Sequence, residues 1–127
     1  MRREFSVSKP GAGPFLHIGT YLPMKRYRDI PAFVQLSERV NQQLRQTPGV
    51  VRVGVAARLL SRQFWTCSIW QASDEETIQD FVHSGPHAEA IRKAAKWSTG
   101  AEGFARWTTS SASAIHWDEL FRRLPPK

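Results

Sequence analysis

The stretch FWTCSIWQASDEETIQDFVHSGPHAEAIRKA, residues 64–94, decides the fold. Its first part, FWTCSIWQ, is rich in aromatic and β-branched residues, which is typical of a strand. Ser73 and Glu76 then predict a capping box at the start of a helix, with further acidic residues in the first turn, where negative charge is favoured. The tripeptide SGP ends this helix. Pro86 suits the first position of a second helix, HAEAIRKAAKW, because its missing N–H would have no partner there anyway.

Working outward, the rest of the chain supplies the remaining elements. Toward the N-terminus, PFLHIGTYLP (14–23) and VVRVGVAARLL (50–60) predict two strands. Between them, Asp29 is expected to cap a helix whose apolar residues share one stripe: Phe33, Leu36, Val40 and Leu44. Toward the C-terminus, FARWTTSSA (104–112) predicts a strand and HWDELFRRL (116–124) a short helix.

The order of elements is therefore βαββαβ with a helical tail. Connection rules favour an α+β, ferredoxin-like arrangement, in which a four-stranded antiparallel sheet carries helices on one face. Residues 1–13 lack periodicity and contain KPGAG, so we expect a flexible N-terminal arm. Residues 14–127 are expected to form a single domain.

Large apolar side chains alternate onto both faces of the predicted sheet. The first strand places Phe15, His17 and Tyr21 on one side and Leu16, Ile18 and Leu22 on the other. Neither face suits open water, so we expect a homodimer in which two sheets pack face to face as a closed barrel. The sequence leaves open which strand face meets the partner.

The motifs FWTCSIWQ, SDEETIQDFV, SGPH and HAEAIRKAAKW resemble the dimeric α/β-barrel superfamily, in particular the antibiotic-biosynthesis-monooxygenase-like and spheroidene-monooxygenase-like proteins. The resemblance implies a monooxygenase, acting on an apolar aromatic or polyene small molecule in a pocket between sheet and helices. It also allows a heme-binding protein or heme-dependent enzyme, a cyclase or isomerase, and a non-catalytic ligand-binding dimer. The cofactor is therefore either none or heme.

Two histidines are the candidate catalytic residues. His87 follows the SGP turn, and we expect a general acid or base there, or a heme iron ligand if heme is bound. A structural role, in which its ring closes the turn by a hydrogen bond, is the alternative. His17 lies in the first strand, where the resemblance implies a side chain in the substrate cavity; a histidine bonded across the dimer explains it equally well. His83 is expected at the surface, and His116 at the surface or an interface.

The candidate substrate-binding residues are aromatic or cationic. Tyr21, Trp65 and Trp107 are expected to line a flat apolar pocket, although core packing explains tryptophans as well. Arg106 is a plausible partner for a carboxylate, a propionate or an enolate, and an ordinary salt bridge is the alternative.

Composition excludes several other classes. The single cysteine, Cys67, forms no internal disulfide and no cysteine-based zinc cluster, and it reads as an inert core thiol. No apolar run approaches the roughly 20 residues of a membrane span, and no signal peptide is recognisable, so a cytoplasmic protein is expected. The net charge of +7 comes from scattered cations without a recognition motif, and nucleic-acid binding is not expected.

Overall fold

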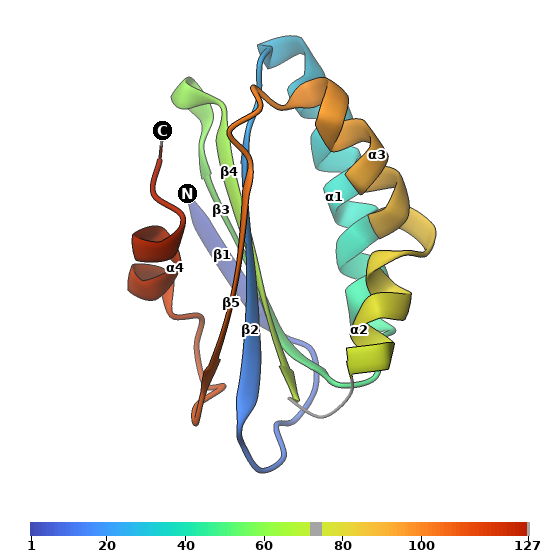
Figure 1. Cartoon of the computed structure of the whole chain (residues 1–127), viewed down its shortest axis with the longest axis vertical. Helices are drawn as coiled ribbons and strands as arrows, with labels where there is room; N and C mark the ends of the chain where they lie inside the picture. The colour runs from blue at the N-terminus through green and yellow to red at the C-terminus, as the bar shows by residue number, and fades with distance from the viewer. Residues whose placement is uncertain (72–74, 127) are drawn as a thin grey trace.

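A five-stranded antiparallel sheet runs through the middle of the molecule (Figure 1). The computed structural model describes residues 1–71 and 75–126. The strands are β1 (Arg2–Ser6), β2 (Phe15–Pro23), β3 (Val50–Arg58), β4 (Gln63–Gln71) and β5 (Gly103–Thr109), in the spatial order β1-β3-β4-β2-β5. Strands β3, β4, β2 and β5, in this spatial order, form the predicted ferredoxin-like arrangement.

Helices lie on both faces of this sheet, which corrects the expectation that they would cover only one. Helices α1 (Ile30–Arg45), α2 (Glu75–Val82) and α3 (Gly85–Trp97) cover one face, and α4 (Trp117–Arg123) covers the other (Figure 1). Two single turns, η1 (Tyr27–Asp29) and η2 (Leu59–Ser61), complete the chain. The capping box predicted at Ser73 falls outside the described residues. Asp29 stands at the start of α1, but its side chain makes no capping hydrogen bond.

Strand β1, which was not predicted, corrects the expectation of a flexible arm, because residues 2–6 pair with β3 along the edge of the sheet. Glu4 on this strand accepts hydrogen bonds from Arg52 Nε (2.6 Å), the Ile115 N–H (3.0 Å) and Trp117 Nε1 (3.3 Å). The arm therefore holds the beginning of α4 in place. The segment RREFS is too polar and too short to show the alternation by which a strand is recognised.

The face under α4 is packed solidly by the same chain. Leu120 and Leu124 of the C-terminal segment join a core cluster with odd-numbered strand residues, including Phe15, Trp65 and Trp107. Gly19 leaves room for this approach, because a Cβ at that position would collide with Leu120. The sheet face that α1, α2 and α3 do not cover is thus covered by the C-terminal segment of the same chain, and the homodimer stays a prediction.

The opposite face carries the even-numbered residues of β2 and β4, packed against α1, α2 and α3. Strand β3 departs from simple alternation, because its register shifts between Val50 and Arg52. Val51 consequently packs in the α4 core while Val53 packs with the helices, although regular alternation would put both on one side. Sheet and helices on this face do not close completely, and the remaining space is the candidate site.

Candidate functional site

A cavity of about 400 Å³ lies between the even-numbered face of the sheet and helices α1, α2 and α3. Its wall is mostly apolar. Contributors from the sheet and the helices include Ile18, Leu22, Phe64, Trp70, Phe104, Phe33, Leu36, Val40, Phe81, Ile91 and Trp97. A concave, largely apolar space of this size with few polar groups is typical of a small-molecule site.

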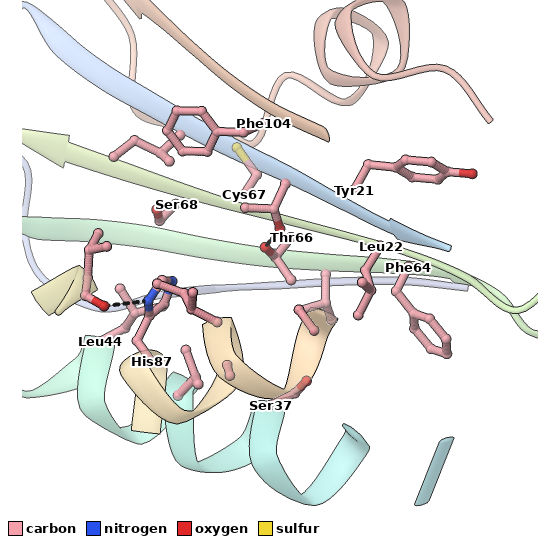
Figure 2. A pocket seen from close by; sticks show the side chains of 18 of the residues that line it. Tyr21, Leu22, Ser37, Leu44, Phe64, Thr66, Cys67, Ser68, His87 and Phe104 are labelled. Carbon is pink, nitrogen blue, oxygen red and sulfur yellow. Dashed lines mark hydrogen bonds between the residues drawn. The ribbon is translucent and has the colours of Figure 1, made fainter. Parts of the chain in front are cut away.

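The polar side chains of the wall face one another across the cavity. Figure 2 shows Ser37 and His87 on the helix side and Thr66 and Ser68 on the strand side. Ser68 accepts a hydrogen bond from Trp70 Nε1 at 2.8 Å, and Thr66 is hydrogen-bonded to the Thr20 hydroxyl. These strand hydroxyls are therefore already oriented by neighbours within the sheet.

His87 is the titratable side chain best placed to act on a molecule in the cavity. Its Nδ1 lies 3.1 Å from the Val82 carbonyl oxygen, and its ring packs on Phe81 with 4.7 Å between centroids. A carbonyl only accepts hydrogen bonds, so Nδ1 carries the proton and Nε2 keeps a lone pair. No other described residue hydrogen-bonds Nε2. The ring thus closes the SGP turn, which is the structural role that the sequence offered as an alternative. Its Nε2 still remains available.

Burial lowers the pKa of His87 below its ordinary value, and the nearby His83 lowers it further, while the bond to Val82 works in the opposite direction. The ring is therefore neutral at pH 7 and can accept a proton. His83 itself is exposed, as predicted.

Gln43 on α1 fixes the position of His87, and sequence reasoning missed this residue. Its Nε2 donates to the carbonyls of Phe81 (3.2 Å) and Ser84 (2.9 Å), and its Oε1 accepts from the His87 backbone N–H at 2.9 Å. The α2–α3 turn is thereby clamped to α1. The one signal in the sequence is an amide directly beside the apolar stripe of this helix, which is too common to single out.

Arg106 faces the cavity from β5 but already has a partner. Its two terminal nitrogens bind the two carboxylate oxygens of Glu75 at 2.8 and 2.7 Å. This two-point ion pair raises the pKa of Arg106, lowers that of Glu75, and links the edge strand β5 to the first residue of α2. The structure therefore shows Arg106 in a salt bridge, the alternative that the sequence left open.

His17 lies on the other face of the sheet, so the structure does not bring the two candidate histidines together. Its ring is fully buried and stacks on Trp107 (5.2 Å between centroids) and His116 (4.8 Å). His17 Nε2 lies 2.7 Å from Thr109 Oγ1, which itself donates to the Ser111 carbonyl at 2.8 Å. Nε2 must therefore donate, and His17 Nδ1 finds no partner among the described atoms.

Burial, followed by the neighbouring His116, lowers the pKa of His17 to about 4. A neutral imidazole enclosed in this way holds strand β2 to the end of β5. It does not reach the cavity that His87 borders.

The three aromatic candidates also pack toward α4. Trp65 Nε1 donates to the Leu124 carbonyl at 2.8 Å, which ties β4 to the C-terminal segment. Tyr21 borders the cavity, but its ring packs on Trp65 at 5.1 Å and its hydroxyl accepts from Gln63 at 3.0 Å. Trp107 belongs to the same core cluster. Burial raises the pKa of Cys67 to about 12, so this thiol is inert, as predicted.

Solved structures share this architecture. A protein of unknown function from Nitrosomonas europaea superposes with a TM-score of 0.64 and 14% identity, over 83% of this chain and 98% of that one. SnoaB, a cofactor-independent oxygenase from Streptomyces nogalater, gives 0.57 and 11% over 80% and 98%. A ferredoxin-fold protein related to antibiotic biosynthesis monooxygenases from Listeria monocytogenes gives 0.63 and 18% over 87% and 63%.

The chain has the ferredoxin-like fold of these proteins. The resemblance predicted from the sequence motifs is thereby confirmed as a likeness of fold. No family model matches the chain, and no curated protein matches it in sequence. None of the described helices combines the length and the apolar composition that a membrane crossing requires.

Proposed function

We propose that the protein is a small oxygenase that acts on an apolar aromatic or polyene molecule held between the sheet and helices α1–α3. One observation carries the proposal: an apolar cavity of about 400 Å³ contains a neutral histidine, His87, with an unpaired Nε2. The fold adds support, because SnoaB is a cofactor-independent oxygenase with the same architecture.

The chemistry assigned to His87 is removal of a proton from carbon. A CH₂ group flanked by aromatic rings and conjugated through them with a carbonyl gives a delocalised enolate once Nε2 takes its proton. That anion reduces oxygen directly: R₂CH₂ and O₂ give R₂C=O and H₂O, and the substrate supplies all the electrons. His87 returns its proton to the departing water.

The wall of the cavity offers hydrogen-bond donors for the oxygen of such an anion. Ser37 and Asn41 stand one turn apart on α1, and the Asn41 amide makes no hydrogen bond to another described residue. Donors already held in a water-poor site stabilise developing charge more strongly than water does. Arg106, which the sequence suggested for this task, is neutralised by Glu75.

Heme fits these residues poorly. His87 Nε2 suits an axial ligand, but the cation expected to hold a propionate is engaged by Glu75 in two hydrogen bonds. The proposed reaction therefore uses no heme. Absorbance near 400 nm on addition of hemin tests this, and we expect no shifted band.

The experiment uses an anthrone, dithranol, as the probe, because its central CH₂ gives an anion of the required kind. We expect oxygen uptake and formation of the quinone in air, with no conversion under nitrogen. Conversion without oxygen would indicate an isomerase or cyclase. Binding without conversion would indicate a ligand-binding protein, and either result would contradict the oxygenase.

A further inference from the structure

One end of the molecule combines exposed apolar side chains with a concentration of positive charge. It is formed by residues 25–28, which lead from β2 into α1, and by residues 58–62, where β3 turns into β4. Both segments lie at the same end of the sheet, at the top of Figure 1. We call these two segments the basic tip.

The apolar part of the basic tip projects into solvent. Leu60 is 89% exposed, Leu59 53% and Tyr27 53%. Met1, which is 68% exposed, lies next to them, because its ammonium donates to the Ala57 carbonyl at 3.0 Å. Single exposed leucines are ordinary. Four large exposed apolar side chains at the same end of the molecule, however, indicate a surface that binds a partner.

These side chains are held in place rather than carried on a loose loop. The Tyr27 hydroxyl donates to the Leu60 carbonyl, which links the two segments. The Arg62 guanidinium lies 4.6 Å from the centre of the Tyr27 ring, and its Nε donates to the Met24 carbonyl at 3.1 Å. The leucines are thus presented on a fixed turn.

The charge of the basic tip is almost entirely positive. Its cations are Lys25, Arg26, Arg28, Arg58 and Arg62. The acids that adjoin it are Asp29, at the end of η1, and Glu102, which is hydrogen-bonded to Ser98 beside Met24. In the described parts of the chain, none of these five cations forms an ion pair with a carboxylate, whereas other arginines do so elsewhere.

We propose that the basic tip docks on the surface of an anionic lipid bilayer. Cations at a negatively charged leaflet and aliphatic side chains in its interface are the two components of peripheral membrane binding. Nucleic acid would satisfy the cations, but it offers no apolar layer to Leu59 and Leu60. Docking of this kind needs no spanning helix.

The position of the basic tip fits the cavity behind it. Phe64 and the half-buried Phe33 and Trp97 form a cluster with Met24, which directly precedes the first segment of the tip. All three aromatic residues also line the cavity. A bilayer at the tip would therefore meet the aromatic end of the cavity, which suits a ligand that dissolves in lipid. The docking itself does not depend on the reaction proposed above.

Flotation of the full chain with vesicles tests the proposal. We expect binding to vesicles of phosphatidylcholine with phosphatidylglycerol, and little binding to phosphatidylcholine alone. Arg26→Gln with Arg28→Gln should weaken binding about fivefold for each cation removed. Leu60→Gln should weaken binding about tenfold, because the leucine side chain no longer buries apolar surface in the bilayer interface.

The control pair is Lys9→Gln with Arg92→Gln, exposed cations outside the basic tip. Lys9 follows Ser8, whose hydroxyl binds the Val50 carbonyl at the opposite end of β3 from Arg58. The control should float like the parent protein. No flotation with anionic vesicles would overturn the proposal. Flotation that is insensitive to Leu60→Gln would also overturn it, and so would an equal loss of flotation in the control pair. Either result would show a general attraction to the positive charge of the protein, which nucleic acid could provide as well.

Discussion

The two faces of the sheet are built from the same strands yet differ in what they enclose. Under α4, Leu120 is fully buried and the tryptophans donate or stack within a solid core. Under α1–α3, the helices stand off the strands and leave a cavity of about 400 Å³. Each face holds one of the two candidate histidines, and of these two only His87 has an unpaired nitrogen facing open space. The difference shows that burial alone does not separate the two rings, whereas access of a free nitrogen to the cavity does.

Replacement of the two histidines should break the comparison most strongly. His87→Gln is expected to lower turnover of the anthrone probe by about 10²–10⁴-fold, because the general base is lost. His17→Gln should leave turnover nearly unchanged, because that ring lies across the sheet from the cavity. Initial rates of oxygen uptake measure both. Equal losses in the two variants would mean that the faces are not functionally separate.

Truncation of one leucine on each face compares solid packing with a hollow. Leu120→Ala should reduce the free energy of unfolding by about 2–5 kcal/mol, since it opens a new void in a closed core. Leu36→Ala should cost less, about 2 kcal/mol, because Leu36 already borders the cavity. Urea denaturation gives both values. A larger loss for Leu36→Ala would contradict the assignment of the solid face.

The stability of the α4 face should depend on pH through His17. The unfolded chain binds a proton at this ring near pH 6.5, whereas the folded chain binds it only near pH 4. The folded state therefore loses about 3 kcal/mol as the pH falls from 6.5 to 4. The difference between parent and His17→Gln unfolding curves across this range isolates the contribution.

His83→Gln is the matched control for this measurement, since His83 is exposed on the other side of the molecule. It should keep the pH dependence of the parent protein. If His17→Gln also kept it, the buried neutral state of His17 would be wrong.

The smallest expected effect sharpens the description of the hollow face. Gln43→Leu removes the clamp on the α2–α3 turn and should lower turnover about tenfold by misplacing His87. Gln42→Leu changes the adjacent, exposed amide and should have little effect. Melting temperatures of both variants separate loss of position from loss of fold. Equal turnover in the two variants would leave Gln43 without a positioning role.

The sequence predicts the central sheet and the faces of most strand residues correctly, because alternation and turn chemistry are local. It does not predict β1, whose five residues are mostly polar. Simple alternation would also misplace Val51, because a bulge in β3 reverses the alternation without any local signal. The C-terminal helix was expected. Its position on the sheet, however, depends on contacts with Glu4 and Gly19, which are distant from it in the sequence.

The candidate site is predicted only in part for the same reason. His87 could be found because the SGP turn that carries it is visible in the sequence. His17, Trp65 and Trp107 are equally prominent residues, yet they lie on the face that α4 fills. Which face is hollow depends on how far the helices stand from the strands, and no local pattern encodes that distance.

The most direct test of the two-face account is a nitrogen NMR spectrum of the histidine rings with and without the anthrone under nitrogen gas. The account predicts a neutral His87 protonated on Nδ1, with an Nε2 signal that moves when the probe binds and a His17 signal that does not. A His87 ring protonated on Nε2, or a probe that moves His17 instead, would contradict it.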